Sequence, residues 1–441
     1  MQKKRSAPAS SATKKKRKTK AAPPKFVAPT HDRLGDPIDE RVRKLIELNH
    51  TLPDQRTAGW YEQRKNCMTA SPISAVLRLT ELEIKMRDDK EVDMKPAKKV
   101  GHVMPAFNSY AELMRIKCGV GPAFTGSVHT EWGVAYEPVV TALYECIEDT
   151  VVHEFGLIPH PTLDWLGASP DGITSQGRML EIKCPFSRIP KELKEGISIP
   201  KMQYWVQMQI QMECCGFDEC DYADIMIREY GSRDEYLRDF YEDPEVGTIY
   251  SRTAVGRPKG FILERNYFDE ESVLRHEYFY PPVLSFTCQQ EEDAWIADWA
   301  KEHLLGFTTD EMVDIALHKT VNYDIRYWYV ENWLVRTVKK NKKWLEDRLP
   351  EVHDFWKLVL KYREEGIPDD LMRPPARESS TPSLSSSSSS LRTSSQGQQT
   401  PLYIDPVNNR LTTKQSSTAS QECLFWDSDE DIDQPIVTNG P

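Results

Sequence analysis

The order of the patterned segments between residues 131 and 229 narrows the fold of this 441-residue chain more than any other feature. The segments are, in chain order, a helix predicted over 131–149, a hairpin over 163–185, a helix over 201–213 and a strand over 221–229. Helices and strands that alternate in this way predict the α/β class, with a central mixed sheet flanked by helices.

The hairpin is the most specific of these predictions. Its first strand is expected to end in the run from Leu166 to Asp171, a connection rich in glycine follows at Gly172, and its second strand covers 179–184. Elsewhere, Ser71-Pro72 is typical of a helix start. Further helices are predicted over 289–304 and 334–365.

The composition divides the chain into three parts. Residues 1–37 are rich in Lys, Ala, Pro and Ser, and we expect a disordered basic arm there. Residues 38–372 are patterned and rich in aromatic side chains, as a folded body requires. Residues 373–441 contain the serine run 385–390 and an acidic end, which predicts a disordered tail.

Taken alone, the net charge of −11 argues against binding to DNA, whose phosphates attract Lys and Arg. The charge is distributed unevenly, however. Residues 1–25 contain ten Lys and Arg and no acidic residue, whereas the segment after Lys414 contains acidic residues and no Lys or Arg. The overall charge therefore does not exclude a nucleic-acid substrate.

Each end of the chain allows two interpretations. The two basic clusters at 3–5 and 14–18 have the spacing of a nuclear-import signal, or they form a nonspecific arm that binds nucleic acid. The apolar and aromatic triplet Leu424-Phe425-Trp426, with the acids after it, would dock in a basic groove of a partner protein, or it is part of a solubilising acidic tail.

Export and membrane insertion are not expected. The chain contains no run of 18 apolar residues and no apolar stretch at its start, so we expect neither a membrane span nor a secretory signal. The nine cysteines are scattered, which is typical of reduced thiols in a cytosolic or nuclear protein. Neither an iron–sulfur cluster nor a zinc site is predicted, because Cys214, Cys215 and Cys220 lack a fourth cysteine at suitable spacing and no Cys/His pairs are spaced as in zinc fingers.

Chemistry is concentrated in the hairpin. Glu181 and Lys183 lie two residues apart on one strand and therefore on one face of the sheet, and Asp171 ends the strand before it. Two carboxylates with the backbone carbonyl of Ile182 form an oxygen site that suits Mg²⁺. Lys183 beside such a site would orient a water and stabilise the negative charge that develops on a phosphate in the transition state. The alternative is a surface salt bridge within a hairpin.

Three further features favour the chemical interpretation. Glu137 in the preceding helix would join the metal site, or it is simply a charge early in that helix. Gln207 and Gln211 share one face of an apolar helix, where a buried amide needs a partner; we assign Gln207 to the water or the phosphate, the alternative being a core glutamine. Arg64 and Ser71 would hold a terminal phosphate.

Taken together, these motifs resemble those of the viral recombinase nucleases similar to phage lambda exonuclease, a family of the PD-(D/E)xK superfamily. The resemblance covers about 56–230, and the helical end of the body, within 286–372, is similar to that of members from large eukaryotic DNA viruses. It rests on these residues, in order: Trp60, Arg64, Thr69-Ala70-Ser71, Gly133, Glu137, Gly167 to Gly172, Glu181-Ile182-Lys183, Tyr204, Gln207 and Gln209.

The resemblance implies a restriction-endonuclease-like core and a Mg²⁺-dependent 5′→3′ exonuclease, with Mn²⁺ as a substitute, that leaves 3′ single strands on duplex DNA for recombination, replication or repair. The metal ligands would be Asp171, Glu181, the Ile182 carbonyl and Glu137. Lys183 and Gln207 would serve the water and the scissile phosphate. Arg64 and Ser71 would bind the 5′-phosphate.

The resemblance also suggests partners and a place in the cell. A single-strand-annealing or single-strand-binding protein would meet the acidic tail, some family members assemble as homo-oligomeric rings, and the basic arm suggests the nucleus or a viral replication site. Residues 231–285 have no counterpart in the phage-type core and would contact DNA or a partner. Two other functions remain open: a structure-specific or nicking endonuclease of the same fold, and a non-catalytic DNA-binding adaptor.

Overall fold

The computed structural model of the chain describes residues 26–77, 79–80, 102–103, 107–121, 127–186, 200–268, 273–304, 321–372, 402–405 and 410–413. The basic clusters at 3–5 and 14–18, the serine run and the acidic end lie outside these residues. Among the described helices, none combines the length and the apolar character that a bilayer crossing requires.

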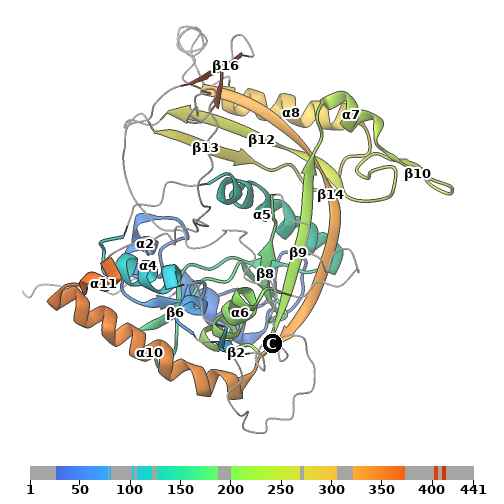
Figure 1. The fold of residues 1–441 in the computed structure, drawn as a ribbon. Coiled ribbons are helices and arrows are strands. Elements are labelled where there is room, and N and C mark those ends of the chain that lie inside the picture. Colours follow the sequence, from blue (N-terminus) through green and yellow to red (C-terminus); the bar gives the residue numbers. More distant parts are fainter. Residues whose placement is uncertain are drawn as a thin grey trace, which may run out of the picture.

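The fold is built on a curled seven-stranded mixed sheet (Figure 1). Only β8 and β9 are parallel to each other, and the other neighbours in the sheet are antiparallel. Along the sheet the strands are β13 (Leu274–Phe279), β12 (Lys259–Phe268), β14 (Val321–Lys339), β9 (Glu219–Glu229), β8 (Met179–Lys183), β7 (Gly172–Thr174) and β4 (Val152–His153).

Helices cover both faces of this sheet. On one face, α5 (Val128–Glu148) packs on Leu180 and Ile182 of β8 and on Ala223, Ile225 and Ile227 of β9. On the other face, α6 (Met202–Cys215) and α10 (Lys342–Glu365) share a second core with Met179, Cys220 and Tyr222. Side chains along β8 and β9 therefore alternate between two apolar layers, as the period of a strand requires.

The two helices beside β8 begin and end at residues suited to those positions. Ser127 caps the start of α5, and Gly216, with φ of 77°, ends α6 in the left-handed conformation. Pro138 lies inside α5 and cannot donate a hydrogen bond to the carbonyl of Val134. The Tyr280 hydroxyl donates to that carbonyl instead, at 3.4 Å, so the helix continues past the proline.

A small three-stranded sheet lies beside α6. In it β6 (Leu166–Ala168) is parallel to β1 (Met68–Thr69) and antiparallel to β5 (Ile158–Pro159). The elements near the start of the chain pack around this sheet and around α10 (Figure 1). They are α1 (Glu40–Asn49), α2 (Ala58–Lys65), the 3₁₀ turn η1 (Ile73–Ala75) and α4 (Phe107–Lys117), with α11 (Asp369–Met372) near the end of the body.

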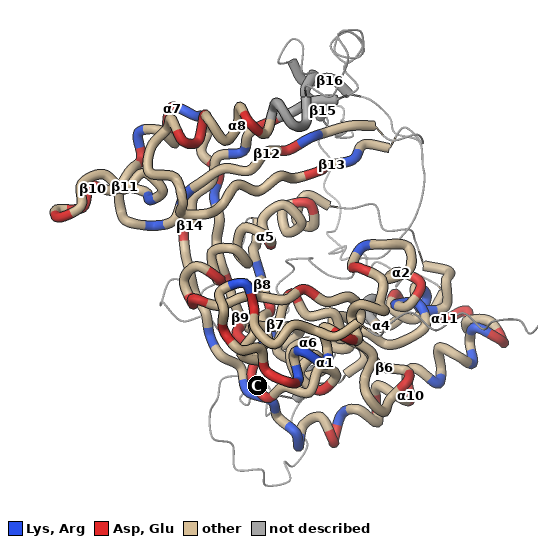
Figure 2. Tube along the Cα trace, turned by 180° about the vertical axis from the view of Figure 1, so that it is seen from behind, with Lys and Arg blue, Asp and Glu red and all other residues tan. Residues whose placement is uncertain are grey.

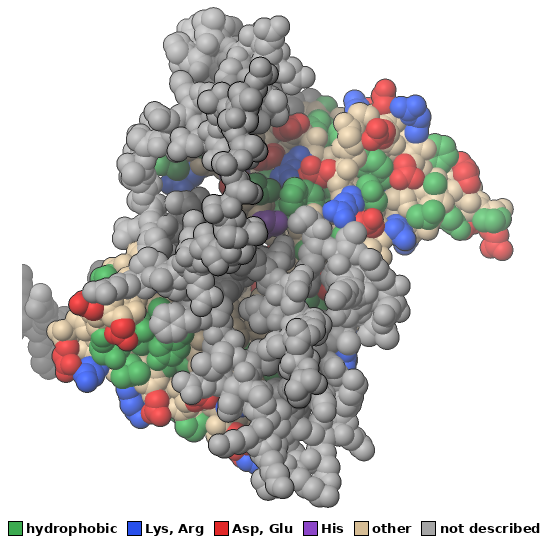
Figure 3. Space-filling model, in the orientation of Figure 1, with side chains coloured by type: hydrophobic (Ala, Val, Ile, Leu, Met, Phe, Trp, Pro, Cys, Tyr) green, Lys and Arg blue, Asp and Glu red, His purple; other side chains and the backbone are tan. Residues whose placement is uncertain are grey.

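Residues 231–285 extend the main sheet through β12 and β13 and add a separate hairpin (Figure 1). The hairpin consists of β10 (Tyr241–Asp243) and β11 (Gly247–Ile249), while α7 (Arg233–Arg238) and α8 (Gln289–Leu304) enclose a third apolar cluster around Tyr236 and Phe261. On the face of the molecule shown in Figure 3, acidic, basic and apolar side chains are mixed over this part. The two remaining strand pairs are β2 (Leu79–Thr80) with β3 (His102–Val103), and β15 (Leu402–Asp405) with β16 (Arg410–Thr413).

The fold class and most predicted elements are confirmed. The helices over 131–149, 201–213 and 289–304 and the strand over 221–229 are present with small shifts at their ends. The start predicted at Ser71-Pro72 is wrong for an α-helix, because only the short turn η1 forms there.

Two further predictions are wrong in detail. The hairpin partner of β8 is β7, which begins at Gly172, whereas the predicted first strand, β6, joins the small sheet. Gly172 lies within a strand, and the close approach of β4 explains why the residue is a glycine. A Cβ at this position would meet Val152 Cγ1 at 2.2 Å. The helix predicted over 334–365 begins only after the cap at Asn341, since the preceding residues continue β14.

Candidate active site

The hairpin brings Asp171, Glu181 and Lys183 together, as predicted. Asp171 immediately precedes β7, and its Oδ2 accepts a hydrogen bond of 2.6 Å from the backbone amide of Ile182 in β8. Lys183 Nζ lies 2.7 Å from Glu181 Oε1 and 4.7 Å from the centre of the Tyr204 ring. Two carboxylates and one ammonium group from adjacent strands therefore meet at one end of the hairpin.

Glu181 is fully buried, which is costly for a carboxylate unless both of its oxygens are paired. Lys183 serves one oxygen, and Gln211 Nε2 donates to the other, Oε2, at 2.8 Å. The same amide nitrogen lies 3.4 Å from the carbonyl oxygen of Ser169. Gln211 thus fixes the orientation of the Glu181 carboxylate from the neighbouring helix.

The glutamines of α6 have different roles. Gln209 is a buried structural residue: its amide donates to the carbonyl of Lys339 at 3.0 Å, and its Oε1 accepts from the backbone amide of Asn341 at 2.6 Å. Gln211 contacts the carboxylate cluster, and Gln207 is partly exposed. Helical spacing placed Gln207 and Gln211 on one face, but it could not reveal which of them reaches Glu181.

Glu137 approaches the cluster from α5. Its carboxylate forms an ion pair of 3.1 Å with Arg56, and both side chains are partly exposed. Partial burial of this carboxylate, opposed by the charges of Arg56 and Lys183, raises the pKa of Glu137 above its usual value. Arg56 was not singled out by the sequence patterns, because nothing in its local sequence links it to Glu137.

The electrostatics of Asp171 show how the carboxylates affect one another. Burial raises the pKa of Asp171 well above its usual range, and the negative charges of Glu181 and Glu137 raise it further. Lys183 and the Ile182 amide oppose this rise only in part. Burial and the neighbouring carboxylates therefore disfavour the charged form of Asp171, and an added cation would favour it.

The donor set fits a divalent cation in its chemistry. Carboxylate oxygens are the ligands that Mg²⁺ prefers, and Asp171, Glu181 and Glu137 each bring one carboxylate to the cluster. Within the described part of the chain, however, no three His, Cys, Asp or Glu side chains converge as a ready-made metal site. The pairs with Lys183 and Arg56 hold two of these carboxylates, so binding a metal ion would require exchange of such partners.

Arg64 and Ser71 belong to a neighbouring region. The Arg64 guanidinium stacks over the ring of Trp60 at 4.3 Å, and Trp60 Nε1 donates to Ser169 Oγ at 3.1 Å. The buried ammonium group of Lys117 donates to the carbonyl of Arg64 at 2.6 Å, which anchors the end of α2. Because β1 and β6 are parallel neighbours, the residues that follow each strand leave the small sheet at the same end. Ser71 follows β1, and Ser169 and Asp171 follow β6.

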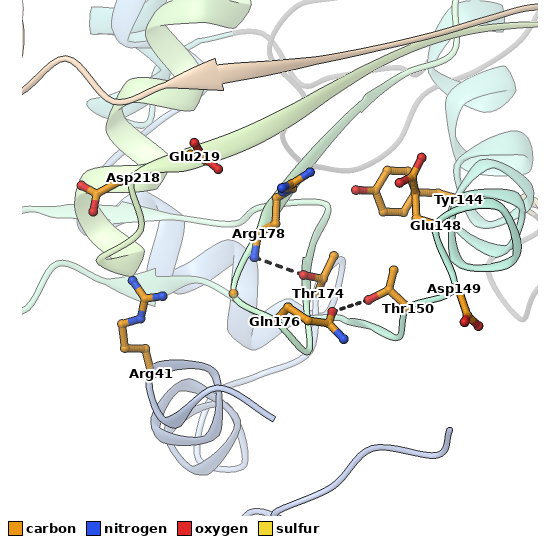
Figure 4. A pocket seen from close by; sticks show the side chains of 11 residues that line it. Arg41, Tyr144, Glu148, Asp149, Thr150, Thr174, Gln176, Arg178, Asp218 and Glu219 are labelled. Carbon is orange, nitrogen blue, oxygen red and sulfur yellow. Dashed lines mark hydrogen bonds between the residues drawn. The ribbon is translucent and has the colours of Figure 1, made fainter. Parts of the chain in front are cut away.

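A cavity of about 550 Å³ lies at the opposite end of the β7–β8 hairpin (Figure 4). Two arginines line it, Arg41 and Arg178, and each is already paired with a carboxylate. Four acidic residues line it as well: Glu148, Asp149, Asp218 and Glu219. Because acids outnumber bases among its lining residues, this cavity would repel a DNA phosphate.

Comparison with known proteins identifies the same part of the chain. Residues 59–218 match the family model of the YqaJ-like viral recombinase domain. An uncharacterized protein of Acanthamoeba polyphaga mimivirus is 28% identical over 333 residues, which are 70% of this chain and 53% of that protein. The chain thus spans about half the length of this relative.

Two solved structures are more distantly similar. One is an alkaline exonuclease of Laribacter hongkongensis, with 19% identity and a TM-score of 0.36, covering 70% of this chain and 95% of that one. The other is a phage-related exonuclease of Haemophilus somnus, with 10% identity and a TM-score of 0.31, covering 68% and 94%.

The family match encloses Arg64, Ser71, Glu137, Asp171, Glu181 and Lys183. These are among the residues on which the resemblance to the lambda-exonuclease-like family rests. Over residues 59–218 the chain is thus similar to the YqaJ-like viral recombinase domain.

Proposed function

We propose that the chain is a metal-dependent 5′→3′ exonuclease that acts on the ends of double-stranded DNA. The observation that carries this proposal is the meeting of Asp171, Glu181 and Lys183 on the β7–β8 hairpin, inside the matched domain. A buried carboxylate held by an amide and an ammonium group is more elaborate than a surface salt bridge needs to be.

Asp171, Glu181, Glu137 and the carbonyl of Ile182 would hold the cation, with Mg²⁺ as the physiological ion and Mn²⁺ as a substitute. The ion, once bound, would neutralise the phosphate and lower the pKa of a water. Lys183 would orient the attacking water and stabilise the charge that develops on the phosphate oxygens. Gln207 is proposed to position the water or the phosphate from α6.

The reaction joins the water oxygen to phosphorus and breaks the bond to the 3′ oxygen of the leaving nucleotide, which takes up a proton. The phosphate then stays on the remaining strand as a new 5′ end. Arg64 and Ser71 are proposed to bind this terminal phosphate, so that each cycle restores the group that they recognise. A 3′ single strand would be left for recombination, replication or repair.

End preference tests this proposal. The full-length protein should degrade linear duplex DNA with 5′-phosphate ends about tenfold faster than duplex DNA with 5′-hydroxyl ends, because a charged contact to the phosphate is worth roughly that factor. Arg64→Ala should remove the difference, whereas Arg33→Ala, which breaks a distant ion pair with Glu145, should keep it. Cleavage of closed circular DNA would instead indicate an endonuclease, and binding without cleavage under any divalent metal would indicate an adaptor.

Partners and location complete the proposal. The acidic end would bind a single-strand-annealing or single-strand-binding protein, the chain would form a homo-oligomer, and residues 1–25 would direct the protein to the nucleus or to a viral replication site. A reporter fused to residues 1–25 should accumulate in nuclei, and a reporter that stays in the cytoplasm would refute the import signal.

A further inference from the structure

Arg56 has an unusual backbone conformation directly before α2. Its φ is 65°, in the left-handed region that glycine adopts freely and that a residue with a Cβ adopts at a cost. Residues held in this region against their preference occur often at functional sites, where the surrounding structure enforces the conformation. The cost of this backbone conformation therefore indicates that the arginine side chain has a function at this position.

The neighbours of Arg56 fix it beside the catalytic hairpin. Gln55 Nε2 donates to the carbonyl of Phe155 at 2.8 Å and lies 3.3 Å from the carbonyl of Pro170, the residue before Asp171. Thr57 Oγ1 closes the turn by donating to the carbonyl of Asp54 at 2.7 Å. The segment that carries Arg56 is thus attached to the same strand end that supplies Asp171.

Stability alone does not explain the arginine. Its ion pair with Glu137 joins side chains that are 42% and 32% exposed, and pairs this exposed stabilise proteins little. Glycine at this position would satisfy the backbone better. The guanidinium, however, is held at the edge of a cluster that contains Glu137, Asp171 and Glu181, where a phosphate group must arrive if the chain is a nuclease.

We infer that Arg56 is a substrate-binding residue that contacts the DNA phosphate at the scissile bond. This inference rests on the proposed nuclease function and adds a residue that lies just before the matched 59–218 segment. The guanidinium of Arg56 pairs with Glu137 at 3.1 Å. If the Glu137 carboxylate binds a metal ion instead, the Arg56 guanidinium is released to bind the substrate. Its planar guanidinium can then donate to two oxygens of one phosphate.

Binding measurements without cleavage test the inference. The full-length protein is titrated with 5′-phosphorylated duplex DNA in EDTA and again in Ca²⁺, by fluorescence anisotropy, over a range of salt concentrations. Arg56→Gly and Arg56→Ala should each weaken binding in Ca²⁺ about tenfold and reduce the slope of log K against log salt by about 0.9, the value for one lost phosphate contact. In EDTA, where Glu137 retains the guanidinium, the loss should be smaller.

Thermal unfolding separates this role from a structural one. Arg56→Gly relieves the backbone and should unfold about two degrees above Arg56→Ala, although both variants bind DNA equally weakly. Arg56→Lys should recover the salt slope but only part of the affinity. The matched control is Arg33→Ala, which removes an exposed arginine paired with Glu145 on the same helix α5 and should leave binding unchanged.

Two results would overturn the inference. The first is a wild-type salt slope in Arg56→Gly while the wild-type protein still binds and degrades DNA, which would refute the role of Arg56 and leave the nuclease proposal intact. The second is a binding loss that follows the unfolding temperature, large in Arg56→Ala and absent in Arg56→Gly. Failure of the wild-type protein itself to bind DNA would refute both proposals together.

Discussion

At the scale of single residues, the central feature is a buried carboxylate with two different partners. Glu181 receives an ammonium group from Lys183 on its own strand and an amide from Gln211 on α6. The first contact follows from the two-residue period of a strand and could be predicted from the sequence. The second depends on how far along its axis α6 lies against β8, which no local pattern specifies.

Replacing Gln211 with alanine should impair metal binding. The Oε2 atom of Glu181 would lose its donor, so the carboxylate would no longer be held in one orientation, and partners of metal ligands are commonly worth 10–100-fold in affinity or activity. We expect the Mn²⁺ concentration that gives half of the metal-induced thermal stabilisation to rise at least tenfold. Stability without metal should fall by about 1–3 kcal/mol.

Gln209→Ala is the matched control for that variant, because Gln209 is an equally buried amide on the same helix and bonds only to backbone groups near Lys339 and Asn341 in the described structure. It should lose similar stability and keep the metal affinity of the wild-type protein. Equal metal affinity in the two variants would show that Gln211 is a core residue without influence on the cluster.

At the scale of elements, the sequence predicted helices better than strand partners. The helix over 131–149 has clear apolar spacing. Its cap at Ser127, and the Tyr280 hydroxyl that donates to the Val134 carbonyl, only become evident in the structure. The pairing of β7 with β8 was missed because Gly172 is typical of a turn in a sequence. Its real role, the close approach of Val152, involves a strand twenty residues away in the chain.

The packing of α8 against β12 gives a prediction at this scale. Glu292 of α8 accepts hydrogen bonds from the hydroxyls of Tyr236 and Tyr250. Lys259 of β12 donates to the carbonyl of Tyr236 at 2.7 Å and lies over both aromatic rings. Burial lowers the pKa of Lys259 from 10.5 to about 8.

The unfolded chain therefore binds more protons at this lysine than the folded chain between about pH 8 and pH 10.5, so Lys259 should make stability rise with pH across that window. Lys259→Met removes this titration. The difference in unfolding temperature, wild type minus variant, should become more positive from pH 7.5 to pH 10. Parallel curves for the two proteins would show that Lys259 titrates normally.

At the scale of the whole molecule, the sheet joins segments that the sequence cannot connect. β14 pairs with both β9 and β12, which brings residues near 330 beside residues near 226 and 259. Such long-range pairing depends on side-chain packing between distant segments rather than on local pattern. For this reason the α/β class could be predicted, whereas the extension of the sheet by residues 231–285 could not.

The distribution of charge over the molecule also depends on the fold. Acidic and basic residues alternate along α10, where several form pairs one turn apart (Figure 2). The net charge of −11 therefore does not describe every surface of the molecule, because acidic and basic side chains are paired along α10. At the site, Arg56 and Lys183 supply positive charge beside the Glu137 and Glu181 carboxylates of a strongly acidic chain.

The most direct measurement is the release of mononucleotides from linear, 5′-phosphorylated duplex DNA by the full-length protein, in Mg²⁺ and in EDTA, beside Lys183→Met. Lys183→Met removes the ammonium group and keeps most of the side-chain volume. We expect release in Mg²⁺ only, from the 5′ end, and a rate at least a hundredfold lower in the variant. Equal rates in wild type and Lys183→Met, or no release by the wild-type protein in Mg²⁺ or Mn²⁺, would contradict a catalytic role for the cluster of Asp171, Glu181 and Lys183.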